Sequence, residues 1–136
     1  MTQANVYLMF NGNCREAMNF YKESLQGKLT FQTVGDSPMA GQMPPQMKDS
    51  ILHSTLTKDA LTIMASDMEQ ENLINGNGYQ INITSDDEKE LNSFFSKMSD
   101  GGKIKLPFGN MPWGAKLGML TDKFGKNWMF SFDKRS

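Results

Sequence analysis

Cysteine and histidine are almost absent from this chain of 136 residues, in which Cys14 and His53 are each the single residue of their type. One cysteine cannot form an internal disulfide, which fits a reducing compartment. No apolar run approaches the ~20 residues of a membrane span, and the N-terminal residues lack the basic and apolar regions of a signal peptide. We therefore expect a cytoplasmic protein that does not enter a membrane.

A charge excess of either sign is also missing. Fourteen Lys and Arg residues face fifteen Asp and Glu residues, which gives a net charge of −1. This balance excludes a strongly basic nucleic-acid binder, so we expect no nucleic-acid partner. Methionine is abundant, with 12 residues. Its flexible side chain can line a pocket that adapts to a ligand, although ordinary core filling explains the same composition.

The first half of the chain has the patterns of a strand, a helix and three further strands. Residues 5–10 are rich in strand-forming side chains, and Asn13 with Glu16 has the spacing of a capping box. The buried face of the following helix is predicted from apolar residues at helical spacing: Cys14, Ala17, Met18, Tyr21 and Leu25. Gly27 is expected to cap its C-terminus. Residues 29–34, 51–57 and 61–65 are expected strands, and the proline-rich residues 35–49 an expected loop.

The second half repeats this order. A strand over residues 79–84 precedes a second capping box, Ser85 with Glu88, and strands are expected at residues 103–108, 115–121 and 127–132. The helical face between them consists of Leu91, Phe94, Phe95 and Met98. An offset of 74 residues relates Gly27 to Gly101 and places Tyr7 on Ile81. The sequence thus predicts one domain, residues 1–136, of two βαβββ modules, about 1–67 and 78–136.

The chain resembles the vicinal oxygen chelate superfamily, which includes glyoxalase I and bleomycin-resistance proteins, and most closely its PhnB-like branch. The residues that carry the resemblance are 7–13 (YLMFNGN), 51–56 (ILHSTL), 113–115 (WGA) and 118–122 (GMLTD). The resemblance implies an α+β fold in which two tandem βαβββ modules form a curved, half-open sheet around a cavity, and it implies a homodimer. The branch is often labelled by analogy with a demethylubiquinone methyltransferase. The sequence has no Gly-rich strand–turn–helix motif for a nucleotide-like cofactor, so this label finds no support in it.

Metal-dependent members of the superfamily hold a divalent ion with one ligand from each of four strands. Carried over by the resemblance, the four positions fall on or beside Val6, among residues 63–66, on Gln80 and among residues 129–131. Only Gln80 offers a weak ligand, whereas such a site needs at least three converging imidazole, thiolate or carboxylate groups. We therefore expect no catalytic metal and no other cofactor.

His53 is the strongest single candidate for a functional residue. In its predicted strand it faces away from Leu52 and Leu56, toward the implied cavity. A neutral imidazole there could act as a general base or orient a polar ligand. The alternative is a half-buried histidine bonded to a neighbouring strand or to Asp67, which lies near a strand end of the expected wall.

Polar side chains on the fifth expected strand and one tryptophan complete the candidate site. Gln80, Asn82 and Thr84 alternate on one face, and a cavity wall there would be polar. Trp113 follows a turn at the expected cavity mouth and could stack on a flat ligand, whereas Trp128 is expected in the core. The predicted ligand-binding residues are His53, Asp67, Gln80, Asn82 and Trp113.

The function that these features favour is metal-independent binding of a small organic molecule, with residues 35–49 as a lid or simply a mobile loop. The rival interpretation is a lyase, isomerase or dioxygenase-type enzyme that uses a divalent metal or His53 as a base. A purely structural module, the third alternative, would have a filled cavity.

Overall fold

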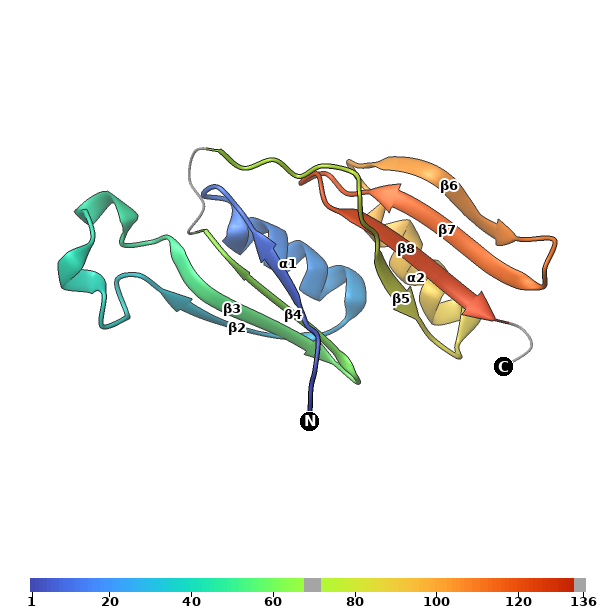
Figure 1. Cartoon of the computed structure of the whole chain (residues 1–136), viewed down its shortest axis with the longest axis horizontal. Helices are drawn as coiled ribbons and strands as arrows, with labels where there is room; N and C mark the ends of the chain where they lie inside the picture. Colours follow the sequence, from blue (N-terminus) through green and yellow to red (C-terminus); the bar gives the residue numbers. More distant parts are fainter. Residues whose placement is uncertain (68–71, 134–136) are drawn as a thin grey trace. The chain divides into compact units, whose positions relative to one another are not determined.

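The computed structural model describes residues 1–67 and 72–133 and divides the chain into two compact units, Met1–Ile74 and Asn75–Ser136. In its described residues each unit contains a four-stranded sheet and one α-helix, in the order strand, helix and three strands (Figure 1). This order confirms the predicted α+β class and the tandem βαβββ arrangement. None of the helices in the described part of the chain is long and apolar enough to cross a membrane.

The first unit is built from β1 (Val6–Met9), α1 (Cys14–Leu25), β2 (Lys28–Thr33), β3 (Ile51–Lys58) and β4 (Leu61–Ser66). The strand order is β1-β4-β3-β2, with β1 parallel to β4 and the other neighbours antiparallel. The five apolar residues that predicted the buried face of α1 are all fully buried. Where the sequence predicts only a loop, two short 3-10 helices form, η1 (Ala40–Gln42) and η2 (Pro45–Met47).

The second unit repeats this topology with β5 (Ile81–Thr84), α2 (Glu88–Met98), β6 (Lys103–Asn110), β7 (Ala115–Thr121) and β8 (Asn127–Asp133). The strand order is β5-β8-β7-β6, and β5 is parallel to β8. The four predicted residues of the α2 face are buried. Gly118 of β7 allows close packing beneath this helix, because a Cβ there would lie 2.8 Å from Phe95 Cε2 and 2.9 Å from Phe108 Cα.

The N-terminus of α1 is capped from a distance rather than by the predicted box. The Asn13 side chain makes no capping hydrogen bond. Instead, Asp67 Oδ1 accepts the backbone N–H groups of Gly12 and Cys14, each at 2.9 Å. The prediction of an Asn13–Glu16 box is therefore wrong, because a buried carboxylate from the far end of β4 satisfies the free N–H groups at this end of the helix.

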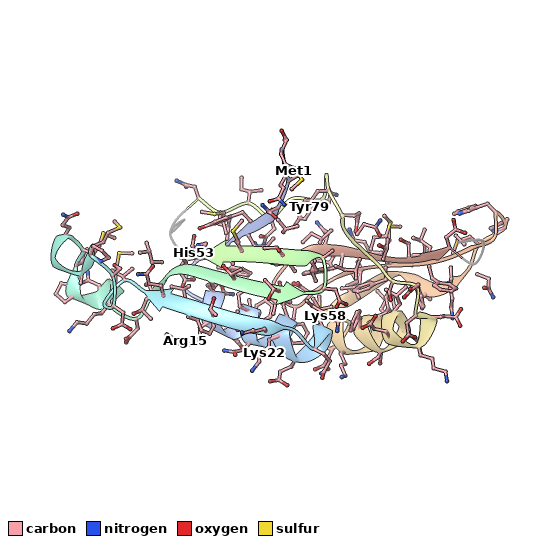
Figure 2. The ribbon with its side chains drawn as sticks, turned by 90° about the horizontal axis from the view of Figure 1, so that it is seen from below. Met1, Arg15, Lys22, His53, Lys58 and Tyr79 are labelled. Atoms are coloured by element: carbon pink, nitrogen blue, oxygen red, sulfur yellow. The ribbon has the colours of Figure 1, made fainter. Side chains whose placement is uncertain are left out.

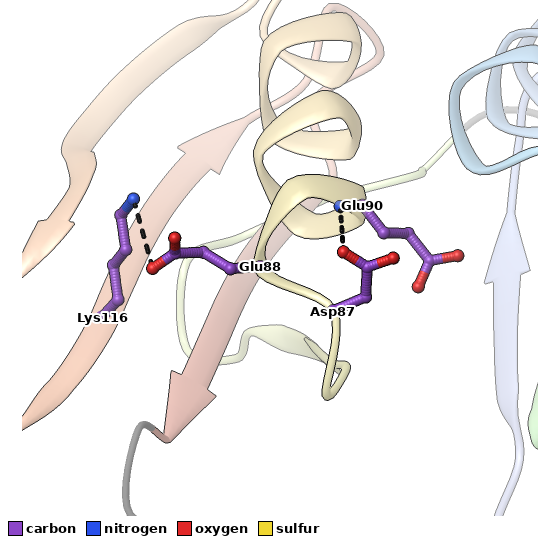
Figure 3. Close-up of polar contacts among 4 residues, drawn as sticks. All are labelled: Asp87, Glu88, Glu90 and Lys116. Carbon is purple, nitrogen blue, oxygen red and sulfur yellow. Dashed lines mark hydrogen bonds and ion pairs between the residues drawn. The ribbon is translucent and has the colours of Figure 1, made fainter.

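The second predicted capping box is also displaced. The N-cap of α2 is Asp87, whose Oδ1 accepts the backbone N–H of Glu90 at 3.1 Å (Figure 3). Ser85, the predicted cap, donates its hydroxyl to Glu90 Oε2 at 2.8 Å and accepts the Asp87 N–H at 3.0 Å. The N-cap thus lies two residues later than predicted, because the Asp87 carboxylate, not the Ser85 hydroxyl, accepts a backbone N–H of the first turn.

The residues after the two helices show that the predicted offset between equivalent positions of the two units is too small by one residue. In α1 the left-handed cap is Gln26, with φ 58°, and its counterpart in the second unit is Gly101, with φ 74°. Gly27 is required for another reason, since a Cβ there would lie 2.8 Å from Leu56 Cδ1. Its equivalent is Gly102, so the glycines are related by 75 residues rather than the predicted 74.

The first strands of the two units, β1 and β5, are also related by 75 residues rather than 74. Tyr7 is paired with Met64 and is exposed, whereas Ile81, its predicted counterpart, is buried. Asn82, paired with Met129, occupies the position equivalent to Tyr7. A shift of one residue in a strand exchanges its two faces, so the predicted match of Tyr7 with Ile81 is wrong.

Candidate functional site

Each sheet packs one face against its own helix. Ser54 and Leu56 of β3 are buried on the side of α1, where Cys14 Sγ lies 3.6 Å from Ser54 Oγ. Because side chains alternate along a strand, His53 and Thr55 lie on the opposite face. We call this opposite face the open face; in the first unit it carries Tyr7, His53, Thr55 and Met64, and in the second Asn82, Leu117, Met119, Met129 and Ser131.

His53 is exposed on the first open face, beside two side chains that can share its interactions. Its Nε2 lies 3.1 Å from Thr55 Oγ1, a hydrogen bond whose direction depends on the imidazole tautomer. The Tyr7 ring lies alongside, with ring centroids 6.2 Å apart and an interplanar angle of 40°. Figure 2 shows His53 on one side of the sheet and the α1 residues Arg15 and Lys22 on the other.

These three side chains form a small polar and aromatic patch. Tyr7 is 46% exposed, so its ring offers a flat surface next to the imidazole. An imidazole nitrogen, a phenol and a hydroxyl can each donate or accept a hydrogen bond. The patch can therefore orient a polar ligand, and an exposed imidazole can also accept a proton from it.

Asp67 does not lie in this patch. Its side chain is 2% exposed, and besides the two N–H groups near α1 its Oδ2 accepts the backbone N–H of Ile51 at 3.0 Å. Its own N–H donates to the Ile51 carbonyl at 2.9 Å. The carboxylate thus joins the end of β4 to the start of β3 and to the segment before α1, and this geometry assigns it a structural role rather than the expected ligand contact.

The second open face combines polar and apolar side chains. Asn82 is exposed, and its Oδ1 accepts the Ser131 hydroxyl from the neighbouring strand at 2.9 Å. Gln80 lies one residue before β5, and its Oε1 is buried without a hydrogen-bond partner in the described part of the chain. An unsatisfied buried acceptor is costly and can be satisfied by a ligand that donates a hydrogen bond. Leu117, Met119 and Met129 supply the apolar surface beside these groups.

An open depression of about 650 Å³ lies in the second unit, at the end of β5 and β8. It includes Ser131, the hydrogen-bond partner of Asn82, so it adjoins the polar edge of the second open face. Its other lining residues are Thr84, Ser85, Asp86, Ala115, Phe132 and Asp133. The volume is in the range of pockets that hold small organic molecules.

The two tryptophans have different surroundings. Trp128 is fully buried and its indole N–H donates to Asp122 Oδ2 at 2.7 Å, so it is a core residue with a satisfied polar group. Trp113 is 58% exposed in the turn between β6 and β7. An exposed indole leaves its ring available for stacking.

The four strands on which the resemblance places metal ligands carry other chemical groups. Where β1 pairs with β4 and β5 with β8, the open faces carry Tyr7 with Met64 and Asn82 with Met129. Across residues 1–67 and 72–133, no three or more His, Cys, Asp or Glu side chains are grouped so that they could hold a metal ion. Phenol, thioether and amide groups are not the imidazole and carboxylate set that a divalent transition metal prefers, so these residues do not fit such an ion.

Tyr7, Thr55 and Ser131, which contact His53 or Asn82, are candidate residues that sequence reasoning missed. Thr55 follows His53 by two positions in the same strand, so alternation alone could have placed it beside the imidazole. Tyr7 and Ser131 depend on which strands pair and in which register. Because the predicted offset between the units was wrong by one residue, Tyr7 was matched with Ile81 instead of Asn82.

Comparison with known protein families identifies the family of this chain. A family model described as 3-demethylubiquinone-9 3-methyltransferase matches residues 2–131. The chain belongs to this family. At the level of the fold, the chain is also similar to a glyoxalase-related enzyme from Fulvimarina pelagi, with a TM-score of 0.65 and 15% identity over 98% of this chain and 89% of the other.

Other relatives are similar over nearly their whole length. The crystal structure of protein PA1353 from Pseudomonas aeruginosa is 36% identical, with 98% of each chain covered and a TM-score of 0.85. A putative 3-demethylubiquinone-9 3-methyltransferase, PhnB protein, from Bacillus cereus is 26% identical over 96% of this chain and 99% of the other, with a TM-score of 0.76. Protein YjdN of Escherichia coli is 28% identical over 95% of this chain and 94% of its own.

Proposed function

We propose that this family member binds a small organic molecule on the open faces of its sheets and needs no catalytic divalent metal. The observation that carries the proposal is the placement of His53, the one imidazole of the chain, exposed and hydrogen-bonded to Thr55 rather than packed under α1. The partly exposed ring of Tyr7 lies beside it, so this face brings a ring and two hydrogen-bonding groups together. Asn82 and Ser131 supply a second polar pair on the other sheet.

The metal-free part of the proposal rests on the donor set. The positions to which the resemblance carries the four ligands offer only Gln80, and the neighbouring open-face residues Tyr7, Met64, Asn82 and Met129 supply no imidazole or carboxylate. A melting curve with and without zinc or nickel tests this part. Stabilisation by micromolar metal at one equivalent would contradict it, because only binding to the folded state shifts the equilibrium in this way.

An enzyme that uses His53 as a base is the second candidate. The hydrogen bond between His53 Nε2 and Thr55 Oγ1 favours it, because this bond orients the imidazole and engages only one of its two nitrogens, so the other can transfer a proton. The two functions are separated by incubating the protein with a bound compound and analysing that compound by mass spectrometry. An unchanged compound supports the binder, and a converted compound supports the enzyme.

The test of the site is a compound screen followed by calorimetric titration of variants. For a compound that binds, we expect His53→Ala to weaken affinity by about tenfold or more, equivalent to ~1.4 kcal/mol. The change should leave stability within about 1 kcal/mol, because an exposed side chain gives up few contacts. Lys22→Ala, on the helix side of the sheet, is the matched control. Equal affinities of the wild type and His53→Ala for every compound found would contradict the site.

A homodimer in the cytoplasm is also part of this proposal. The apolar side chains of the second open face, Leu117, Met119 and Met129, support association, and the single cysteine fits a reducing compartment. Sedimentation at high micromolar concentration is expected to give a dimer, and a clean monomer would contradict this. Cell fractionation that finds the protein outside the cytoplasm would contradict the location.

A further inference from the structure

Three asparagines of this chain are followed directly by glycine: Asn11–Gly12, Asn75–Gly76 and Asn77–Gly78. An asparagine side chain can be attacked by the backbone nitrogen of the next residue. Glycine at that position removes the steric hindrance of a Cβ and allows the backbone to reach the geometry of attack. The sequence makes the three sites chemically equal, and the structure makes them different.

The first site is held by Asp67. The N–H of Gly12, whose nitrogen would have to attack, donates to Asp67 Oδ1 at 2.9 Å. A charged acceptor strengthens such a hydrogen bond and opposes loss of the proton from the nitrogen. Because Asp67 is buried and also bonded to Cys14 and Ile51, this segment has little freedom to rearrange.

The second site is held by the loop between β7 and β8. The Asn75 side chain donates from Nδ2 to the Phe124 carbonyl at 3.4 Å, and its Oδ1 accepts the Lys126 ammonium group. The Gly76 carbonyl in turn accepts Asn127 Nδ2 at 3.0 Å. Both polar atoms of Asn75 and the peptide that follows are therefore fixed, and the side-chain carbon cannot turn toward the Gly76 nitrogen without breaking these bonds.

The third site has none of these restraints. Asn77 and Gly78 are both exposed, and a Cβ added to Gly78 would meet no atom within 4 Å. Within the described residues, neither the Asn77 side chain nor the Gly78 N–H has a hydrogen-bond partner. The side chain and the attacking nitrogen are thus free to approach each other.

We propose that Asn77 is a site of spontaneous deamidation, whereas Asn11 and Asn75 are protected by the fold. The Gly78 nitrogen loses its proton to water or hydroxide and forms a bond to Asn77 Cγ. The Cγ–Nδ2 bond then breaks, and the nitrogen leaves as ammonia after taking up a proton. Water opens the resulting five-membered imide at either carbonyl, which gives aspartate or isoaspartate with no oxidation or reduction.

The modification has a defined place in the chain. It puts one new negative charge on the segment that leads into β5, three residues before Gln80. The isoaspartate product also lengthens the main chain by one carbon at this point. The inference does not depend on the proposed function, because it concerns the restraints on three peptide bonds and not the nature of a ligand.

The experiment follows the three sites in one sample by peptide mass spectrometry, during incubation of the whole chain in mildly alkaline buffer. The same incubation in concentrated urea gives the rate of each site without the fold. We expect Asn77 to react at a similar rate in both conditions. Asn11 and Asn75 should be slowed by about tenfold or more in the folded protein, which corresponds to ~1.4 kcal/mol.

Gly78→Ala is the control variant. It should lower the rate at Asn77 and leave the rates at the other two sites unchanged, because Gly78 is exposed and has room for a methyl group. The proposal is contradicted if the folded protein protects Asn77 as strongly as Asn11 and Asn75. Modification of Asn75 before Asn77 in the folded protein would contradict it as well.

Discussion

The two units share one topology but hold the N-terminus of their helix in opposite ways. In the second unit the cap is local, because Asp87 directly precedes α2 and accepts the N–H of Glu90. In the first unit the acceptor is Asp67, which is 53 residues along the chain from Cys14. A local cap orders one turn of helix, whereas the distant carboxylate also ties β3 and β4 to the segment before the helix.

A second difference lies at the other end of the helices. Gly101, the residue type that adopts a left-handed backbone without strain, stands two residues before β6, whereas the first unit places Gln26 two residues before β2. Lys116 of β7 also reaches the first turn of α2, with its Nζ 3.7 Å from Glu88 Oε1 (Figure 3). The second unit therefore caps its helix with the residue directly before it, whereas the first uses a buried carboxylate that is distant in the sequence.

The largest effect should come from Asp67→Ala. The change leaves the N–H groups of Gly12, Cys14 and Ile51 without the acceptor that they share, so we expect the free energy of unfolding to fall by about 3 kcal/mol. Urea denaturation measures this. Asp87→Ala is the matched control and should cost about 1 kcal/mol, the usual value of a lost N-cap. Equal losses in the free energy of unfolding for the two variants would contradict the claim that the two units hold their helices differently.

The next effect concerns the core of the second unit. Trp128→Phe removes the indole N–H that Asp122 Oδ2 accepts and leaves a space in the core, so stability should fall by about 2 kcal/mol. Trp113→Phe, in an exposed turn, should stay within about 0.5 kcal/mol of the wild type. Both are measured by urea denaturation followed by circular dichroism. A large loss for Trp113→Phe would mean that this indole is structural.

The smallest effect should come from the helix C-termini. Gln26→Gly relieves a left-handed backbone and should raise stability by about 0.5 kcal/mol, reduced by the loss of the hydrogen bond from Gln26 Nε2 to Glu23 O. Gly101→Gln places the first unit's residue in the second and should lower stability by a similar amount. Thermal unfolding of the two variants measures both signs, and two changes of the same sign would contradict the equivalence of these positions.

Local patterns predicted much of the fold. The apolar spacing of Cys14, Tyr21 and Leu25 located α1, and the alternation of Ile81 and Ile83 located β5, because each depends only on neighbouring residues. The helix caps were predicted wrongly because more than one side chain can accept the same backbone N–H groups. Asn13 is a good capping residue by type, but nothing near it in the sequence shows that Asp67 satisfies the same N–H groups.

The candidate site was predicted less completely than the fold. The faces of His53 and Asn82 followed from alternation, since it operates within a single strand. Tyr7 and Ser131 could not be assigned in this way, because their neighbours are set by the pairing of β1 with β4 and of β5 with β8. Asp67 was expected at a cavity wall from its place at a strand end, and only its three backbone partners show that its carboxylate is turned into the structure.

The most direct test of the central claim is a map of a bound compound by nuclear magnetic resonance. Backbone and side-chain shifts are recorded for the free protein and during titration with a compound from the screen. We predict that the largest changes fall on the open faces, at Tyr7, His53 and Thr55 or at Asn82 and Ser131. Changes confined to the helix side, around Arg15 and Lys22, would contradict the claim that the open faces form the binding site.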